Sequence, residues 1–537
     1  MLREKAYQEL VSNAPYDIIV IGGGATGAGI VLDAASRGLK AALIEKNDFA
    51  EGTSGRSTKL VHGGVRYLEL AVKHFDKVQY NLVKDALFER GILLKNAPHL
   101  VKKLTLVTPL YKWYELPYIY AGLTFYDILA GVKGLGRSRL LSKKNVLSRF
   151  SVVHEKGLKG GVLYYDGHFN DARTNISIAL TAVKYGAHIL NHTAAVSLLK
   201  ESGKVKGVVI KDKITGKEQE LAATCVVNAT GPFIDGVRRM DNPDIKPMIQ
   251  VSSGIHIVLD KKFMLNDMGL MIPKTEDGRV LFILPWEGRC LIGTTDEVAQ
   301  VNEHPLAKEK DIDYLLRHIN KYFDVAIKKE DIKAVWSGLR PLVSDPKAAD
   351  TARLARDHVL EISDSGLFSI AGGKWTTYRK MALDVVDNAV KRFDLKTERG
   401  CITDKIFLYG GDNYDKNGAG KLTKDFNLDI HIAEHLNNDY GDKAQYVAKI
   451  ASEGYGELLA EGFPYIEAEV IYAVRYEYAM RAIDFLARRV PLALLDQFAA
   501  EKASHRIVEL MGQELNLNEA EIKAEVEDVT ERLNVSI

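Results

Sequence analysis

The chain has 537 residues and a formal net charge of +1 at pH 7, with 72 Lys and Arg against 71 Asp and Glu. This length allows two or three domains, and the balanced charge gives no indication of a nucleic-acid partner. The three cysteines are far apart and form no CxxC pair, so neither a disulfide framework nor a zinc site is indicated, and a reducing compartment fits.

The N-terminal stretch, residues 1–13, is mixed and charged. It lacks the apolar core of a signal peptide and the Arg and Ser bias of a transit peptide, so we expect neither. The sequence has no apolar run of about 18 residues, the length that predicts a transmembrane helix. A monotopic contact with a membrane surface stays open.

The first predicted element is a buried parallel strand over residues 16–21. It runs into the turn Gly22-x-Gly24-x-x-Gly27, a helical pattern follows, and the next apolar run ends at Glu45. A βαβ unit of this form is the dinucleotide-binding fingerprint: the glycines let a pyrophosphate approach the backbone, and the acid accepts hydrogen bonds from ribose. An ordinary glycine-rich turn is the alternative.

A polar stretch rich in glycine and hydroxyl groups follows over residues 52–68. Its hydroxyl donors and Lys59 suit a pyrophosphate or the edge of a flavin, and a plain surface loop is the alternative. Residues 69–97 are predicted to be helical.

Residues 104–131 are rich in aromatic and apolar side chains, and a basic cluster follows them. Aromatic residues next to basic ones are typical of an interfacial membrane anchor. A core helix with a solvated basic loop explains the same pattern. The basic residues are Lys133, Arg137, Arg139, Lys143 and Lys144.

The second half of the chain predicts two further approaches to a dinucleotide. An apolar strand ends in Ala229-Thr230-Gly231, a pattern that two-domain flavoproteins use at the adenosine side of FAD, although a simple strand end is the alternative. Residues 366–379 form another glycine turn before a helix. Beside a flavin, that helix N-terminus would stabilise the N1/O2 anion of the reduced ring and ease hydride acceptance.

Between and after these turns, the sequence predicts two other units. Residues 251–345 alternate apolar and polar side chains, which predicts an antiparallel sheet over the substrate pocket, and residues 396–537 are predicted to be helical. Residues 413–418 echo the start of a calcium loop, but Lys424 stands where the bidentate Glu is required. We therefore predict no metal site.

Six blocks carry a family resemblance: residues 22–29, 59–69, 165–167, 293–296, 337–342 and 372–379. Together they resemble the FAD-dependent glycerol-3-phosphate dehydrogenase family over nearly the whole chain. The resemblance implies an α/β fold with a Rossmann-like FAD-binding domain of the glutathione-reductase or amino-acid-oxidase type, an antiparallel-sheet substrate domain and an all-α C-terminal domain. The expected boundaries are 14–85, 160–235 and 355–395 for the FAD-binding domain, 86–159 and 236–354 for the substrate domain, and 396–537 for the helical domain.

The expected reaction is oxidation of sn-glycerol 3-phosphate to dihydroxyacetone phosphate, and it needs a hydride acceptor, a base and cations for the phosphate. The resemblance places Arg66, Arg340, Arg356 and Lys374 at the phosphate and the developing oxyanion. His62 and His256 are the candidate bases because histidine can change its charge near neutral pH, and a hydrogen-bonded structural histidine is the alternative for each. Tyr67 and Thr376 add hydrogen bonds.

The expected cofactor contacts follow the glycine turns and the hydroxyl-rich stretch. They are Gly22, Gly24, Ala25, Thr26, Gly27, Glu45, Lys46, Thr53, Ser54, Ser57, Thr58, Lys59, Leu60, His62, Gly63, Gly64, Ala195, Ala229, Gly231, Gly338, Gly373, Lys374, Trp375 and Thr376.

Two departures from the family's pattern bear on the electron acceptor. The mitochondrial members carry a transit peptide and C-terminal calcium-binding units, and the oxidases carry an extra segment; we find none of these here. We therefore expect a homodimeric, bacterial-type enzyme in the cytoplasm, held peripherally on an anionic membrane surface and reducing a membrane quinone. An oxygen-dependent oxidase is the alternative. An FAD-bound scaffold and an amino-acid oxidase fit the cation set less well.

Overall fold

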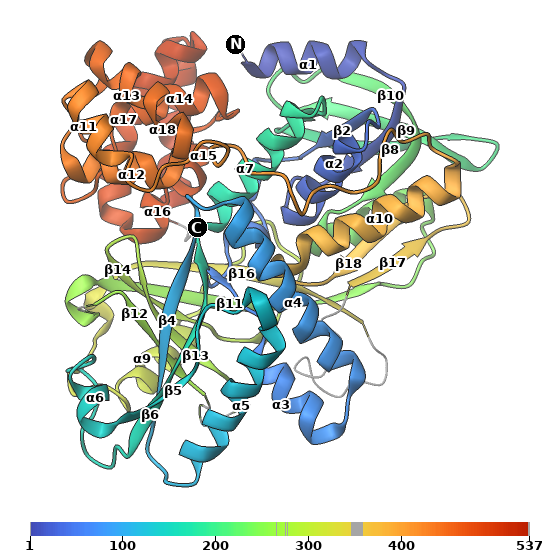
Figure 1. Cartoon of the computed structure of the whole chain (residues 1–537). Helices are drawn as coiled ribbons and strands as arrows, with labels where there is room; N and C mark the ends of the chain where they lie inside the picture. The colour runs from blue at the N-terminus through green and yellow to red at the C-terminus, as the bar shows by residue number, and fades with distance from the viewer. Residues whose placement is uncertain (1, 265, 274, 276–277, 345–357, 535–537) are drawn as a thin grey trace.

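The computed structural model describes residues 2–264, 266–273, 275, 278–344 and 358–534, and of residues 2, 66, 70–72 and 74 it describes only the backbone. Figure 1 shows three parts: an α/β domain around β1 and β10, a second sheet domain below it, and a helical domain built from the C-terminal segment. This arrangement confirms the predicted fold class.

The α/β domain is built on a sheet in the order β17-β18-β10-β1-β2-β7, with β8 and β9 attached beside β10. The strands from β18 to β7 run parallel, and α2 and α10 pack together beside them. The strands are β1 (Tyr16–Ile21), β2 (Ala41–Ile44), β7 (His188–Leu190), β8 (Thr193–Glu201), β9 (Lys204–Asp212), β10 (Glu218–Asn228), β17 (His358–Ile362) and β18 (Phe368–Gly372); the helices are α1 (Leu2–Ser12), α2 (Ala25–Ser36), α7 (Asp171–Lys184), α8 (Ile234–Asp241) and α10 (Tyr378–Phe393).

The second sheet follows the order β15-β11-β14-β13-β12-β4-β6-β3, with β16 on β11 and β5 on β6. Its pairings are antiparallel except for β12 with β4. The strands are β3 (Leu60–Val61), β4 (Val101–Leu110), β5 (Arg139–Ser142), β6 (Gly160–Phe169), β11 (Ile249–Asp260), β12 (Met268–Ile272), β13 (Leu281–Trp286), β14 (Arg289–Gly293), β15 (Glu297–Val298) and β16 (Ile332–Val343); the helices are α3 (Val65–His74), α4 (Lys77–Asn96), α5 (Glu115–Ala130), α6 (Lys143–Leu147) and α9 (Glu309–Ile319).

The helical domain packs on both other domains. Many of its buried apolar side chains form one core with Trp286 and Trp336 of the second sheet, and others form a core within the domain. Burial of such large side chains is the main force that fixes one domain on another. The helices are α11 (Ala419–Phe426), α12 (Ile430–Tyr440), α13 (Ala444–Ile450), α14 (Glu467–Tyr476), α15 (Ala482–Asp484), α16 (Leu492–Leu495), α17 (Gln497–Leu515) and α18 (Glu519–Asn534).

Two expected domain boundaries differ from the structure. The boundary between residues 85 and 86 falls inside α4, which is continuous from Lys77 to Asn96. The boundary before residue 160 assigns β6 to the FAD-binding domain, but β6 pairs with β4 along its length and so belongs to the second sheet. Alternating side chains alone do not reveal which sheet a strand joins.

Residues 104–131 also differ from both expectations in part. Their first quarter, residues 104–110, completes β4, a strand in the second sheet. Residues 115–130 form α5, of which only Leu123, Tyr126 and Ala130 are buried, so α5 is not a core helix. Among the described helices, none combines the length and the apolar character needed to cross a membrane.

Candidate active site

The glycine turn after β1 is formed by close approaches of the backbone. Gly22 has φ of +110°, and a Cβ on it would lie 2.6 Å from the carbonyl oxygen of Ala229, just beyond β10. A Cβ on Gly27 would lie 1.9 Å from the carbonyl oxygen of Gly22. Neither position accepts a side chain, which confirms the predicted tight turn and the close packing of helix on strand.

Glu45 holds this turn from the end of β2. Its Oε2 accepts the N–H of Gly23 at 2.6 Å, and its Oε1 accepts that of Asn47 at 2.8 Å. Burial raises the pKa of the Glu45 carboxyl, while the two amides oppose that shift. The structure thus gives Glu45 a part in fixing the turn, and its contact with a ribose stays a prediction.

The hydroxyl-rich stretch lies over the N-terminus of α2. Ala25 donates its N–H to Ser54 Oγ at 2.9 Å, and a Cβ on Gly24 would meet the same oxygen at 2.9 Å. The N–H groups of a first helical turn and its dipole favour an anion at this point. Ser54 therefore packs against the N-terminus of α2, so this stretch is not a separate surface loop.

The same stretch reaches β16 in the second sheet. Thr53 Oγ1 donates to the carbonyl oxygen of Leu339 at 2.6 Å, and Arg56 Nη1 donates to that of Ser337 at 3.2 Å. A Cβ on Gly338 would lie 3.0 Å from Arg56. These contacts bring the block at 337–342 against the stretch that precedes His62.

The turn after β18 reaches the stretch from the other side. Trp375 Nε1 donates to the carbonyl oxygen of Ser54 at 2.9 Å, and Thr376 Oγ1 donates to that of His62 at 3.3 Å. Lys374 Nζ lies 4.3 Å from the ring centroid of Tyr67, a cation–π contact. The blocks at 337–342 and 372–379 therefore both contact the stretch that runs from Thr53 to Tyr67.

His62 is joined to a buried carboxylate. Its Nδ1 is hydrogen-bonded to Asp166, and its Nε2 accepts the N–H of Val65 at 3.3 Å. This pattern makes Nδ1 the protonated nitrogen. The Nε2 contact is longer than a usual hydrogen bond, so its lone pair is open to a stronger donor. The side chain is 25% exposed, which leaves it accessible.

Asp166 is fixed from three sides. Besides His62, its carboxylate accepts hydrogen bonds from Arg90 Nη1 at 2.7 Å and from the Tyr126 hydroxyl at 3.0 Å. Burial acts to raise the pKa of Asp166, but His62 and Arg90 outweigh it and lower the pKa. Asp166 is therefore a carboxylate that orients the His62 ring.

His256 has a different environment. It is 2% exposed, its ring stacks on Trp336 with centroids 4.1 Å apart, and its Nε2 lies 3.0 Å from Thr58 Oγ1. Burial lowers the pKa of His256 well below its usual value, and Arg340 and Lys59 act in the same direction. This ring therefore stays neutral, and of the two candidate bases the geometry favours His62.

Arg340 projects from β16 towards the end of β14. Its guanidinium donates to Thr294 Oγ1 at 2.9 Å and to the carbonyl oxygen of Thr295 at 3.0 Å, and lies 3.3 Å from Asp296. Since β11 pairs with β16, His256 and Arg340 share this strand pair. The block at 293–296 thus supports the arginine.

One prediction is wrong and needs correction. Lys59 does not offer its ammonium group to a pyrophosphate, because its side chain is 1% exposed and Nζ is bonded to Asp171 at 2.6 Å and to the carbonyl oxygen of Gly55 at 2.8 Å. The ammonium also lies over the rings of Trp286 and Trp336. A buried cation needs such a partner. Lys59 therefore links the hydroxyl-rich stretch to α7 through Asp171.

Other predicted residues have simpler outcomes. Arg356 lies outside the described residues, as does the side chain of Arg66. Lys46 forms an exposed ion pair with Glu303. The remaining cofactor contacts stay predictions.

Asp166, Arg90 and Tyr126 carry no local sequence signal that assigns them to the site. Asp166 stands in one of the six blocks, but its partner His62 lies 104 residues away in the chain. A pairing over this distance depends on β3 lying beside β6, which a single sequence does not disclose.

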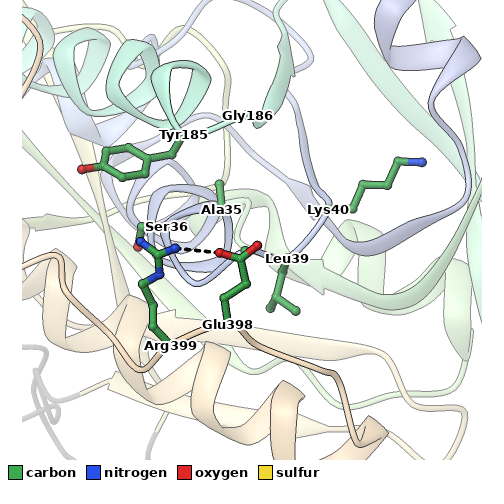
Figure 2. A pocket seen from close by; sticks show the side chains of 9 residues that line it. Ala35, Ser36, Leu39, Lys40, Tyr185, Gly186, Glu398 and Arg399 are labelled. Carbon is green, nitrogen blue, oxygen red and sulfur yellow. Dashed lines mark hydrogen bonds and ion pairs between the residues drawn. The ribbon is translucent and has the colours of Figure 1, made fainter.

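A hollow of about 370 Å³ lies at the opposite end of α2, between Ser36, Lys40, Tyr185 and Arg399 (Figure 2). The twelve residues of α2 separate it from the glycine turn by about 18 Å. It is therefore not part of this site.

Comparisons with known proteins match nearly the whole chain. A family model described as FAD dependent oxidoreductase matches residues 17–379, and one described as C-terminal domain of alpha-glycerophosphate oxidase matches residues 401–522. The chain is 49% identical to the mitochondrial glycerol-3-phosphate dehydrogenase of Rattus norvegicus and 48% identical to that of Homo sapiens, over 98% of this chain and 74% of each relative.

Solved structures of similar proteins include a glycerol-3-phosphate dehydrogenase and a more distant oxidase. The glycerol-3-phosphate dehydrogenase of Bacillus halodurans, solved with FAD, has a TM-score of 0.81 and 31% identity, over 99% of this chain and 97% of that chain. The L-alpha-glycerophosphate oxidase of Mycoplasma pneumoniae, also with FAD bound, has a TM-score of 0.55 and 15% identity over 71% of this chain and 95% of that chain, a similarity of fold alone.

Proposed function

The chain belongs to the FAD-dependent glycerol-3-phosphate dehydrogenase family, and from that premise we propose that it oxidises sn-glycerol 3-phosphate to dihydroxyacetone phosphate and passes the electrons to a membrane quinone. The observation that carries the site assignment is that the stretch containing His62 contacts two other blocks. Lys374 lies over Tyr67, Thr376 donates to the carbonyl oxygen of His62, and Thr53 donates to Leu339 of β16. A base and cations then surround one region beside the glycine turn.

The residues of the glycine turn fit FAD, the cofactor of this family. The Gly22 and Gly27 positions admit no side chain, and the N-terminus of α2 lies under the hydroxyl-rich stretch, which is the setting that a pyrophosphate requires. When bound, FAD supplies the acceptor for the hydride from the alcohol carbon.

His62 then accepts the hydroxyl proton at Nε2. Its Nδ1–H is already directed at Asp166, so the imidazolium that forms is stabilised where it stands and needs no reorientation. Arg90 remains bonded to the other oxygen of Asp166. His62 thus takes up and releases a proton at Nε2, while the Asp166 carboxylate stays hydrogen-bonded to Nδ1.

Arg340 and Lys374 hold the phosphate and the developing oxyanion. Arginine offers a planar fork that matches phosphate oxygens, and lysine offers a single point charge. Thr294 and Thr295 orient the guanidinium of Arg340 before substrate arrives. We assign Arg66 and Arg356 to the same phosphate from the family motif.

A membrane contact on α5 and its flanks would bring the quinone to the enzyme. Trp113, Tyr114, Tyr118, Ile128 and Val132 have exposed fractions from 49% to 104%, and Arg137, Arg139 and Lys144 close by are also exposed. Exposed aromatic groups with basic neighbours suit an anionic bilayer surface. We propose that two copies of the chain form a homodimer and that this surface binds the cytoplasmic face of the cell membrane.

Anaerobic flavin reduction tests this function. The holoenzyme should bleach on mixing with glycerol 3-phosphate, and the reduced enzyme should reoxidise faster with a soluble quinone analogue than with oxygen. Failure to bleach would contradict the substrate assignment. Rapid reoxidation by oxygen with peroxide release, and no response to the quinone analogue, would favour the oxidase instead.

A further inference from the structure

The loop that follows Glu45 is held by the helical domain. Asp48, in this loop, is fully buried. Its Oδ2 accepts hydrogen bonds from Arg488 Nε at 2.6 Å and Arg489 Nη1 at 2.7 Å, and its Oδ1 accepts one from Arg489 Nη2 at 3.0 Å. Both arginines belong to a short helical turn, Phe485–Arg489, of the C-terminal segment.

Two further acids complete this cluster. Arg488 also bonds Asp484 at 2.7 Å and lies 3.3 Å from Glu51, the residue three positions after Asp48. Although burial acts to raise the pKa of Glu51, Arg488 and Arg532 lower it. The buried charges of the cluster therefore neutralise one another across the domain boundary.

Asp48, His192 and Asp484 could geometrically hold a metal ion, since their ligand atoms lie within 4.8 Å of one another. The guanidinium groups of Arg488 and Arg489 already occupy these carboxylates. We therefore treat the cluster as an ion-pair network.

The residues between Asp48 and Glu51 lead directly to the glycine turn. Ala50 donates its N–H to the carbonyl oxygen of Gly23 at 3.2 Å. A Cβ on Gly23 would lie 2.8 Å from the Phe49 ring, and that ring packs edge-on against Tyr478 of the helical domain with centroids 5.9 Å apart. Movement of this loop would thus displace the backbone that faces the pyrophosphate.

We propose that Arg488 and Arg489 are positioning residues for the cofactor: through Asp48 they fix the glycine turn, so the helical domain sets the affinity for FAD. Neither arginine touches the turn itself. The effect passes from Asp48 through Phe49 and Ala50 to Gly23. This role is independent of the substrate and of the electron acceptor.

The test is FAD binding to apoprotein prepared from Arg489→Met and from Arg481→Met. Arg481 forms a 2.6 Å ion pair with Glu525 inside the helical domain and serves as the control. Because a charged hydrogen bond is removed from the path to the turn, Arg489→Met should raise the FAD dissociation constant about tenfold or more. Arg481→Met should leave it within about twofold of wild type.

Arg489→Lys keeps the charge but cannot bridge both oxygens of Asp48. This variant tests the proposal if Arg489→Met does not fold. It should weaken FAD binding to an intermediate degree, with the KM for glycerol 3-phosphate unchanged in saturating FAD. FAD affinity within about twofold of wild type in the soluble Arg489 variant, together with a lowered Tm, would overturn the proposal and make the cluster a stability element alone.

Discussion

The orientation of the His62 ring depends on the carboxylate of Asp166, which lies 104 residues away in the chain. Asp166→Asn keeps the shape of the side chain but removes the charge that faces the His62 ring, and an amide in this place can donate to Nδ1 and favour the wrong tautomer. We expect the rate of anaerobic flavin reduction to fall about 100-fold or more, with little change in the KM for glycerol 3-phosphate.

Stopped-flow measurement of flavin bleaching checks this prediction. Tyr126→Phe is the matched control, since it removes the neutral hydrogen bonds that the Tyr126 hydroxyl makes with Asp166 at 3.0 Å and with the N–H of Gly63 at 2.8 Å and keeps the charge of Asp166; its rate should stay within about tenfold of wild type. Equal losses in both variants would assign Asp166 to packing and not to the orientation of His62.

Arg340 is the cation whose surroundings are best defined. Arg340→Ala should remove about 2–4 kcal/mol of transition-state stabilisation, because the group that faces the developing negative charge is lost. The measurement is kcat/KM with glycerol 3-phosphate. Arg340→Lys should recover part of the loss through its charge, and an alanine variant within about threefold of wild type would show that Arg340 is structural.

At the scale of elements, α12 and α14 are joined by a buried pair whose stability depends on pH. His435 Nε2 lies 2.7 Å from Glu469 Oε1. Burial acts to lower the pKa of His435, but Glu469, with Asp439 and Glu287, raises it to about 9. Because the folded pKa is the higher one, this stability is fully present below pH 6.5 and is lost as the pH rises through 9.

The expected size of this effect is about 3 kcal/mol, since the pKa rises from 6.5 to about 9. Urea unfolding of the wild-type protein from pH 6 to pH 10 should show a decline in the free energy of unfolding that His435→Gln largely removes. A decline of the same slope in both proteins would assign the pH dependence to other groups.

The sequence revealed those elements whose signal is contiguous. The glycine turn, the strand at 225–228 and the helix to Lys184 were predicted because period and turn residues lie within one segment. The local sequence predicts the wrong role for Lys59 because its partner Asp171 is 112 residues away. Composition does not predict a strand for residues 104–110, because they are a strand only through their pairing with β6.

At the scale of the whole molecule, exposed apolar groups gather at one end. The helix α5 lies beside α3, and both helices stand at the lower edge of Figure 1, away from the helical domain. Phe75, at the end of α3, is 95% exposed. A patch of this kind at one pole is a marker of an interaction surface, and its basic neighbours favour an anionic membrane.

The triple change Trp113→Ser, Ile128→Ser and Val132→Ser should therefore weaken cosedimentation with anionic phospholipid vesicles by about tenfold or more, because each serine removes apolar area that the bilayer would bury. Flavin reduction by glycerol 3-phosphate in solution should be unchanged, since none of the three belongs to the active site. Phe498→Ser is the control: Phe498 is 77% exposed on the helical domain and should not affect binding. Vesicle binding of the triple variant at the wild-type level would mean that membrane contact does not use this pole.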